Sequence, residues 1–164
     1  MGTETMNYII RPLALEDEPF LWEMLYHAIY IPPEHAPLPR DIIQTPELAS
    51  YVQGWGREGD RGFLGSETQT NQPIGAVWLR SPRAGHQGYG YVDDNTSELS
   101  IAVLPEYRGQ GVGTQLLTHL FASELGRLSV SLSVSVGNPA VRLYERFGFE
   151  IIRKSNGSLT MKRN

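Results

Sequence analysis

The chain has 164 residues, and its 14 basic and 18 acidic side chains give a formal net charge of -4. That length suits one domain, and the acidic balance argues against a protein that binds nucleic acid by neutralising phosphates. The sequence contains no cysteine, which excludes disulfides, thiolate metal ligands and a cysteine nucleophile.

The hydropathy of the chain gives no sign of a membrane or export segment. No run of about 18 apolar residues is present, and the polar N-terminus lacks an apolar stretch of signal-peptide length. We therefore expect a cytoplasmic protein without a membrane partner. One domain is expected to span residues 1–164, with residues 1–6 as a frayed tail.

Hydrophobic periodicity, with proline and glycine as breaks, predicts strands and helices in a definite order. The expected strands are 8–11, 62–67, 73–80, 97–104, 128–136, 149–154 and 158–163. The expected helices are 18–30, 46–55, 112–127 and 139–147. Because a helix joins the strands at 97–104 and 128–136, these two strands should lie parallel. The predicted fold class is α/β, with a central mixed sheet of six to seven strands and helices on both faces.

A glycine-rich turn separates the strand at 97–104 from the next helix. It reads Arg108-Gly109-Gln110-Gly111-Val112-Gly113. Glycines let the backbone come close to a ligand, and the free N–H groups at a helix N-terminus form an anion site. Arg108 adds a charge that pairs with phosphate oxygens, so a pyrophosphate is the natural occupant. The alternative interpretation is a flexible turn that holds no ligand.

Two common phosphate motifs do not fit this turn. The dinucleotide fingerprint G-x-G-x-x-G fails because Leu116 stands where the third glycine belongs. A Walker A loop needs Gly-Lys followed by Ser or Thr, which the turn lacks. A nucleotide-binding α/β domain that uses the turn in another way stays as an alternative.

The same turn resembles a signature of the GNAT acetyltransferases. RGQGVG at 108–113 is similar to the family pattern R/Q-x-x-G-x-G/A, and ELSIAVL before it is similar to the family's fourth strand. Downstream, NPAVRLYERFGF at 138–149 is similar to the second signature, N-x-x-A-x-x-L-Y-x-x-x-G-F, with the alanine displaced. The resemblance covers nearly the whole chain and implies a GNAT-type fold.

The resemblance implies transfer of an acetyl group from acetyl-CoA to an amine, by direct attack in a ternary complex and without a metal. It places the pantetheine arm along the strand edge at Ile101 and Val103, whose side chains are equally consistent with ordinary strand core. The Ile101 amide is the candidate donor to the thioester oxygen, which gains negative charge in the transition state. The implied cofactor-binding residues are Ile101, Val103, Arg108, Gly109, Gln110, Gly111, Val112, Gly113, Thr114, Asn138 and Tyr144.

Two residues take their roles from the second signature. Tyr144 stands at the family's position for a phenol that protonates the departing thiolate, whose conjugate acid has a pKa of about 8.5 by analogy with cysteine. Because Val141, Tyr144 and Phe147 share one helix face, the alternative is a core tyrosine. Asn138 is first a helix cap and also a candidate cofactor contact.

The acceptor amine must be neutral to attack. An amine of pKa about 10.4 needs roughly 4.6 kcal/mol to lose its proton at about pH 7, whereas an α-amine of pKa about 7.8 needs only about 1 kcal/mol. Glu98, at the start of its strand, is the candidate general base, acting through a water that Ser135 could hold. The alternative for Glu98 is a solvated carboxylate at a strand end.

Aromatic side chains are the candidates for the acceptor site. Trp22, Tyr26 and Tyr30 recur every four residues on the first helix and could line the pocket, although such stripes often belong to a core. Tyr89 and Tyr91, in a glycine-rich loop, could fold over the site.

The remaining expectations concern metals, binding partners and alternative functions. The histidines show no metal-ligand spacing, so we assign no metal; they are His27, His35, His86 and His119. The expected partner is a small-molecule or peptide amine, and the resemblance admits a homodimer. A rival of a different class is a non-catalytic acyl-CoA-binding or sensor domain on the same fold, against which the presence of Tyr144 and of a candidate base argues.

Overall fold

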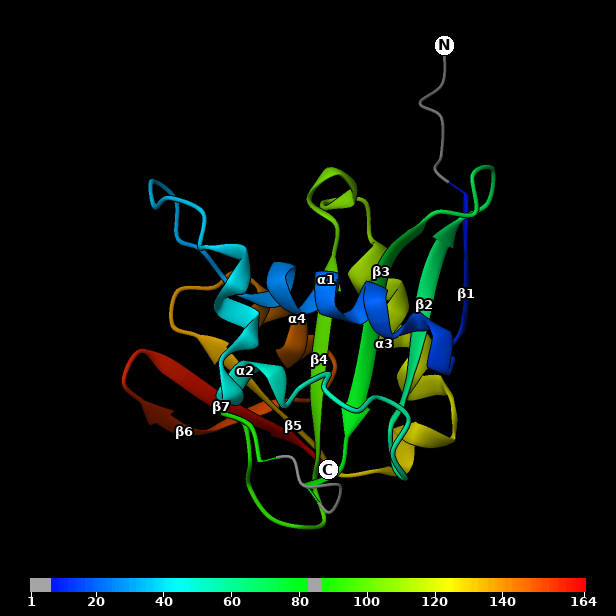
Figure 1. Cartoon of the computed structure of the whole chain (residues 1–164). Coiled ribbons are helices and arrows are strands. Elements are labelled where there is room, and N and C mark those ends of the chain that lie inside the picture. The colour runs from blue at the N-terminus through cyan, green and yellow to red at the C-terminus, as the bar shows by residue number, and fades with distance from the viewer. Residues whose placement is uncertain (1–6, 83–86) are drawn as a thin grey trace.

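Seven strands form one mixed sheet, in the order β1-β2-β3-β4-β5-β7-β6 (Figure 1). The computed structural model describes residues 7–82 and 87–164, so the expected tail at residues 1–6 lies outside the described residues. The strands are β1 (Tyr8–Pro12), β2 (Arg61–Glu67), β3 (Pro73–Arg80), β4 (Ser97–Val103), β5 (Val130–Ser135), β6 (Glu150–Ser155) and β7 (Ser158–Arg163). The predicted fold class is confirmed.

The sheet is antiparallel except where β4 meets β5. These two strands run parallel, as the helical connection between them predicts, and they pair only at Ser97↔Val130 and Glu98↔Ser131. β4 continues to Val103 and β5 to Ser135 without further pairing, so the strands separate toward their carboxyl ends. A gap therefore opens in the middle of the sheet beside the second half of β4.

Helices cover both faces of the sheet, as predicted. α1 and α2 lie on one face, and α3 and α4 on the other (Figure 1). The α-helices are α1 (Glu18–Ala28), α2 (Pro46–Ala49), α3 (Val112–Ala122) and α4 (Ala140–Arg146). Short 3-10 helices are η1 (Leu15–Asp17), η2 (Arg40–Gln44), η4 (Pro105–Tyr107) and η5 (Glu124–Arg127). Within the described ranges, no helix has the length and apolar character that crossing a bilayer requires.

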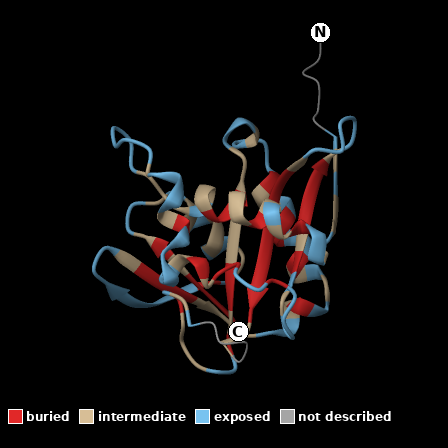
Figure 2. Ribbon diagram, in the orientation of Figure 1, coloured by how far each residue is buried: buried red, intermediate tan, exposed pale blue. Residues whose placement is uncertain are grey.

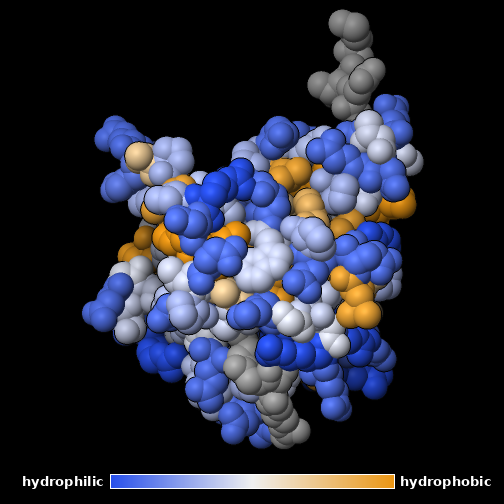
Figure 3. All heavy atoms as spheres, viewed as in Figure 1, coloured by the Kyte–Doolittle hydropathy of each residue, from blue (hydrophilic) through white to orange (hydrophobic). Residues whose placement is uncertain are grey.

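Successive side chains of β3 point to opposite faces of the sheet and pack in two separate hydrophobic cores. Val77 and Leu79 pack in the cluster that includes Leu116 of α3, whereas Trp78 packs in the cluster that includes Leu21 of α1. Buried residues follow β2, β3 and β4 through the centre of the molecule (Figure 2). Seen from the side of α1, the surface is mostly hydrophilic with separate hydrophobic patches (Figure 3). The sheet is therefore packed against a hydrophobic core on each face, and the gap between β4 and β5 lies within it.

The second helix is shorter than the apolar pattern predicts. α2 stops at Ala49 rather than at residue 55, and turns follow it. Gly54 and Gly56 in these turns have φ of +73° and +108°. A residue with positive φ cannot continue a right-handed helix, so a helix cannot pass through Gly54 to residue 55.

The first and third helices also end early. α1 stops at Ala28 rather than at residue 30, because Ile29 is already extended ahead of the two prolines that follow. α3 stops at Ala122 rather than at residue 127, because Ser123 is extended and its Oγ accepts the Leu125 N–H at 3.2 Å. The serine thereby caps η5 as a separate short helix.

A buried ion pair ties β3 to the turns after α2. Nε and Nη2 of Arg80 donate to Asp60 at 3.0 and 2.9 Å, and Nη1 donates to the carbonyls of Ser50 and Gln53 at 2.9 and 2.8 Å. The side chains of Arg80 and Asp60 are 1% and 0% exposed. The pair therefore fixes the backbone on both sides of Tyr51, which lies between the two carbonyls.

We expect Arg80→Met to lower the free energy of unfolding by about 3–5 kcal/mol, because it leaves the Asp60 carboxylate buried without its partner. Arg61→Met is the control, since Arg61 and its partner Glu124 are 53% and 72% exposed. Removing that exposed pair should cost less than about 1 kcal/mol. Urea unfolding measures both variants, and equal losses would contradict the burial argument.

Candidate functional site

Two cavities open where β4 and β5 separate. The first, of about 670 Å³, lies against the glycine turn and is called the glycine-turn cavity. The second, of about 530 Å³, lies between the separated strands and is called the splay cavity. The residues that line both are Ala28, Ile29, Tyr30, Ile101, Asn138 and Tyr144. The two cavities therefore meet between the end of α1, the middle of β4 and the start of α4.

The glycine turn exposes its backbone to the first cavity. Gly109 and Gly111 have φ of +76° and +83°, and a Cβ at either position would have no atom within 4 Å. α3 begins at Val112, so its first N–H groups have no acceptor within the helix. Gly113 and Thr114, in that first turn, also line the cavity. This is the geometry of an anion cradle, in which amides and the helix dipole face the ligand.

The two polar side chains of the turn behave differently. Arg108 lines the glycine-turn cavity, and its guanidinium donates to the carbonyls of Val103 and His27 at 3.1 Å each. It thereby ties the turn to β4 and to the end of α1, with its charge beside the cradle. Gln110 does not line the cavity, because its side chain turns back to the Glu106 carbonyl at 3.4 Å.

The backbone of β4 directs the Ile101 amide into the gap. Leu104 N–H donates to Ile74 O on the β3 side at 2.8 Å, whereas Ser97 N–H donates to Ser129 O on the β5 side at 3.1 Å. Because successive N–H groups of a strand point to opposite sides, the odd-numbered residues of β4 point toward β5. At Ile101, β5 has already moved away. The Ile101 amide therefore faces the place where the cavities meet.

Tyr144 lies at this meeting point, on α4. Its ring packs edge-on against Phe149 with centroids 6.0 Å apart. Burial raises the pKa of its phenol to about 12, so the phenol is neutral at ordinary pH and is available as a proton donor. Within residues 7–82 and 87–164, no side chain or carbonyl forms a hydrogen bond with its hydroxyl. It is thus packed like a core tyrosine and also presents a donor to the cavities.

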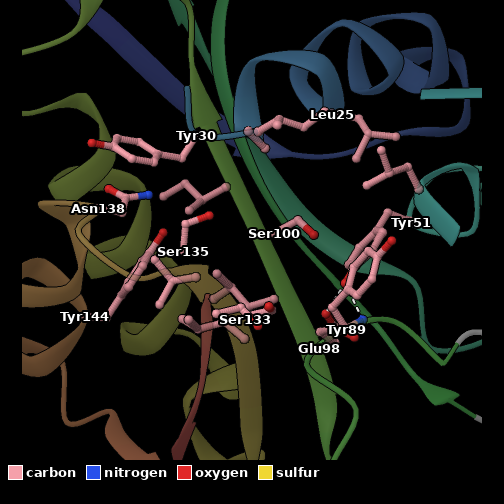
Figure 4. Close-up of a pocket in the computed structure, with 18 of the residues that line it drawn as sticks. Leu25, Tyr30, Tyr51, Tyr89, Glu98, Ser100, Ser133, Ser135, Asn138 and Tyr144 are labelled. Atoms are coloured by element: carbon pink, nitrogen blue, oxygen red, sulfur yellow. Dashed lines mark hydrogen bonds between the residues drawn. The ribbon is translucent and has the colours of Figure 1, made fainter. Parts of the chain in front are cut away.

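Asn138 and Ser135 lie beside Tyr144 at the end of β5 (Figure 4). The Asn138 Oδ1 accepts the Ala140 N–H at 2.9 Å, which confirms it as the cap of α4. Asn138 also lines both cavities, and Ser135 lines the splay cavity. Both side chains are therefore placed to contact a ligand at the junction.

Glu98 is buried in the splay cavity rather than solvated at a strand end. The residue is 3% exposed. Its Oε2 accepts hydrogen bonds from the Tyr51 hydroxyl and, at 3.0 Å, from the Gly90 N–H. The Tyr51 hydroxyl in turn accepts the Tyr89 N–H at 2.8 Å. Figure 4 shows these side chains at the opposite end of the cavity from Tyr144, so a phenol and a carboxylate face the two ends of one space.

The predicted aromatic stripe of α1 reaches the cavities only with its last members. Tyr30 lines both cavities. Tyr26 lines the glycine-turn cavity, and its hydroxyl donates to Leu38 O at 2.6 Å. Trp22 lines neither cavity: its indole N–H donates to Glu18 at 3.2 Å and its ring packs on the α1-side core. From Trp22 to the end of α1 at Ala28 the helix rises about 9 Å, which carries the start of the stripe away from the site.

The glycine-rich loop contributes one of its two tyrosines. Tyr89 lines the splay cavity, whereas the Tyr91 hydroxyl donates to Asp94 at 2.6 Å and Tyr91 lines neither cavity. His86 lies outside the described residues. In the part of the chain that the structure describes, no group of three or more His, Asp or Glu side chains could hold a metal ion.

Several cavity residues were not predicted. Tyr51 lies 47 positions before its partner Glu98, and no local pattern connects two such positions. Ser100 and Ser133 line the splay cavity two residues along from Glu98 and Ser135. Because every second residue of a strand faces the same side, extending the two predicted faces by one step would have found both serines.

The arrangement suits the transfer of a group between two ligands. The amides of the glycine turn and Arg108 can hold an anion, and the Ile101 amide and the neutral Tyr144 phenol can stabilise charge that develops at the junction. The Glu98 carboxylate can accept a proton from the splay cavity. Each ligand would occupy its own cavity, with the reacting atoms at the shared residues.

A comparison of sequences agrees with this geometry. A sequence model of the acetyltransferase (GNAT) domain matches residues 61–151, more than half of the chain. The Mus musculus protein named cysteine-rich protein 2-binding protein is 42% identical over 50 residues, which are 30% of this chain and 6% of that protein. The chain spans less than half the length of the curated relatives that it matches.

Solved structures share the fold over almost the whole chain. The PaiA N-acetyltransferase from Thermoplasma acidophilum, in complex with coenzyme A, has 20% sequence identity and a TM-score of 0.65, covering 97% of this chain and 99% of that one. The ribosomal-protein-S18-alanine N-acetyltransferase from Escherichia coli has 22% identity and a TM-score of 0.61, covering 96% and 93%. At these identities the likeness shows the fold.

Proposed function

The chain belongs to the acetyltransferase (GNAT) family, and we propose that it transfers an acetyl group from acetyl-CoA to a primary amine of a small molecule or peptide. The observation that carries the proposal is the junction of two cavities at Ile101 and Tyr144, one of which ends on an amide cradle. Two separate but joined cavities favour direct attack with both substrates bound, rather than a relay through a covalent enzyme intermediate.

The glycine-turn cavity fits acetyl-CoA. The open backbone at Gly109 and Gly111 leaves room for a pyrophosphate against the first amides of α3, and Arg108 adds a positive charge beside it. When bound, acetyl-CoA supplies an activated acetyl thioester. The Ile101 N–H would donate to the thioester oxygen as it gains negative charge, which lowers the barrier most when the donor is already in place.

Tyr144 would give its proton to the departing sulfur. Burial raises the pKa of Tyr144 to about 12, so the phenol is protonated at ordinary pH and donates a hydrogen bond to the thiolate as it develops. Because a thiol has a pKa of about 8.5, passing the proton to sulfur is uphill by itself and is completed when solvent reprotonates the phenol. The new N–C bond forms as the C–S bond breaks. The sulfur ends as a thiol, and solvent restores the proton of the phenol.

Glu98 would accept the proton that the amine loses. Glu98 and Ile101 are three positions apart on the strand, which is about 10 Å, so the proton would pass through water. Ser100 lies between them on β4, and Ser133 and Ser135 face the same cavity from β5. These hydroxyl groups are suited to hold such a water chain.

The lining of the splay cavity also limits the charge that the acceptor can carry. Among the described residues that line the two cavities, Glu98 is the one carboxylate. One carboxylate can compensate one ammonium group, whereas further buried charges would stay unpaired. A peptide N-terminus or a small amine with a single charge therefore suits the cavity, and the E. coli relative in fold is named for an alanine of a ribosomal protein.

Calorimetry with acetyl-CoA, ATP and NAD, followed by thiol release with a panel of amines, tests the proposal. We expect the protein to bind acetyl-CoA but neither ATP nor NAD, and to release thiol with at least one amine. Binding without thiol release from any amine would favour the non-catalytic sensor. Binding of ATP or NAD in place of acetyl-CoA would favour a nucleotide-binding domain.

We predict that Gly111→Trp raises the Kd for acetyl-CoA at least about 100-fold, because the indole would fill the cradle. Gly137→Trp is the matched control: Gly137 has φ of +88°, a Cβ there would also meet nothing within 4 Å, and it lines neither cavity. Both variants carry similar backbone strain, so only the cradle distinguishes them. Equal affinity of the two variants for acetyl-CoA would place the pyrophosphate elsewhere.

We predict that Tyr144→Phe lowers turnover about 100-fold with the Kd for acetyl-CoA unchanged, because the departing sulfur loses its proton donor. Tyr8→Phe is the control, since Tyr8 packs against the same α3-side core and lines neither cavity. Because the pKa of Tyr144 is raised to about 12, its ionisation should cause no loss of turnover below about pH 11. Undiminished turnover of Tyr144→Phe would remove the phenol from the mechanism.

We predict that Glu98→Gln lowers turnover at least about 100-fold for an amine of pKa about 10.4 and less than about tenfold for one of pKa about 7.8. The glutamine amide cannot accept the proton, and the first amine needs help to lose it. Glu47→Gln, an exposed position on α2, is the control. Thiol release with both amines is measured, and equal losses for the two amines would contradict a role in proton transfer.

A further inference from the structure

Residues 88–91, here called the wall, place Tyr89 against the splay cavity, and side chains from other parts of the chain hold this segment by hydrogen bonds. The Tyr89 N–H donates to the Tyr51 hydroxyl at 2.8 Å, and the Gly90 N–H donates to Glu98 at 3.0 Å. From β5, the buried Ser131 donates its hydroxyl to the Gly90 carbonyl at 2.7 Å. On β6, Arg153 donates to the Tyr91 carbonyl at 2.9 Å. Side-chain hydrogen bonds therefore hold the wall, which is itself neither strand nor helix.

Both glycines of this wall are needed because the backbone lies so close to these groups. A Cβ at Gly88 would overlap the Tyr51 hydroxyl and lie 2.5 Å from Glu98 Oε1. A Cβ at Gly90 would lie 2.8 Å from the Leu132 carbonyl carbon and 3.0 Å from Glu98 Oε2. Neither glycine has a positive φ, so the constraint is contact alone.

Tyr51 is itself fixed by β3. The Trp78 indole N–H donates to the Tyr51 carbonyl at 2.9 Å, and Arg80 donates to the carbonyls on either side, at Ser50 and Gln53. Trp78 and Arg80 stand two residues apart and so face the same side of the sheet. The backbone of Tyr51 is therefore held at three points, which directs its ring toward Glu98.

The Tyr51 hydroxyl acts in two directions at once. It donates to Glu98 and accepts the Tyr89 N–H. Burial and the neighbouring carboxylate raise the pKa of this phenol far above its ordinary value, so the hydroxyl keeps the proton that it donates. One oxygen atom thus sets the position of the carboxylate and of the backbone that carries the Tyr89 ring.

We propose that Tyr51 is a positioning residue of the transferase, which holds the Glu98 carboxylate and the wall at residues 88–91 in one fixed arrangement around the acceptor. The catalytic part of this inference rests on the proposed role of Glu98, whereas the holding of the wall does not. A carboxylate that can rotate would lose its alignment with the water chain, and a wall that moves would widen the cavity beside Tyr89.

The test compares Tyr51→Phe with Tyr91→Phe. Tyr91 belongs to the same segment, but its hydroxyl bonds to Asp94 and it lines neither cavity. Amide hydrogen exchange is measured first, since it needs no substrate. Tyr51→Phe should speed exchange of the Tyr89 amide at least about tenfold, because its acceptor is gone, and Tyr91→Phe should leave that rate unchanged. Unchanged exchange in Tyr51→Phe would overturn the proposal.

Kinetics then test the action through Glu98. Tyr51→Phe should lower kcat/KM for the amine at least about tenfold and leave the Kd for acetyl-CoA unchanged. In a double-mutant cycle with Glu98→Gln, the second substitution should add little to the first, because both remove the same aligned carboxylate. If the double variant lost kcat/KM by the product of the two single-variant factors, the positioning role would be overturned. If the wild-type protein released no thiol with any amine, the proposed function would fail, and hydrogen exchange would still decide whether Tyr51 holds the wall.

Ser131→Ala covers the case in which Tyr51→Phe does not fold. It removes the hydrogen bond to the Gly90 carbonyl and leaves the side chains of Tyr51 and Glu98 intact. Faster exchange of the Gly90 amide, with a severalfold lower kcat/KM for the amine, would support the proposal. Unchanged exchange at Gly90 would show that these side chains do not hold the segment, and would overturn it.

Discussion

The parting of β4 from β5 after two residue pairs is the constraint on which the site depends. A parallel pair that stayed in register would use the Ile101 amide as a ladder donor and would fill the space now open beside it. The separation is possible because each strand keeps a full antiparallel partner on its other side, β3 for β4 and β7 for β5. Beyond Glu98 and Ser131 the two strands no longer pair with each other, so the backbone groups that face the gap are suited to a ligand.

The buried polar groups near this gap are connected by a series of hydrogen bonds. Asp60 neutralises Arg80, Arg80 holds the carbonyls that flank Tyr51, and Tyr51 donates to Glu98. Arg80 and Glu98 also face each other in the register of β3 and β4. A buried carboxylate is costly unless several donors surround it, so the ion pair on β3 contributes to the site as well as to stability.

The parts of the site that follow from local sequence could be predicted. The glycine turn, the Asn138 cap and the strand that carries Ile101 and Glu98 depend on residues close together in the chain, and the structure has each of them where it was expected. Tyr51 could not be predicted, because its role depends on a turn that Gly54 and Arg80 impose and on a partner 47 positions away.

Periodicity alone misjudged the aromatic stripe on α1 for a related reason. It predicts Trp22 and Tyr30 on one helix face, but α1 ends at Ala28, so Tyr30 follows the helix, and only Tyr30 of the two lines the cavities. The predicted length of α2 was wrong for another reason, since its apolar spacing is compatible with a helix and with the buried turns that the chain forms. The first error concerns where the cavity lies along the segment, which tertiary contacts determine, and the second concerns the backbone conformation of a short segment.

The division of the two cavities also limits how an acceptor can approach. If acetyl-CoA occupies the glycine-turn cavity as proposed, Arg108 and the cradle fix one end of it and the Ile101 amide fixes the other. An amine must then reach Tyr144 through the splay cavity, which Tyr89 and Glu98 line. The residues that would select the acceptor therefore include Glu98 on β4 and Tyr89 on the loop before it, and the positions of both depend on the hydroxyl of Tyr51. On the proposed function, selectivity for the acceptor would thus follow from long-range packing, whereas binding of the pyrophosphate would depend on one short sequence.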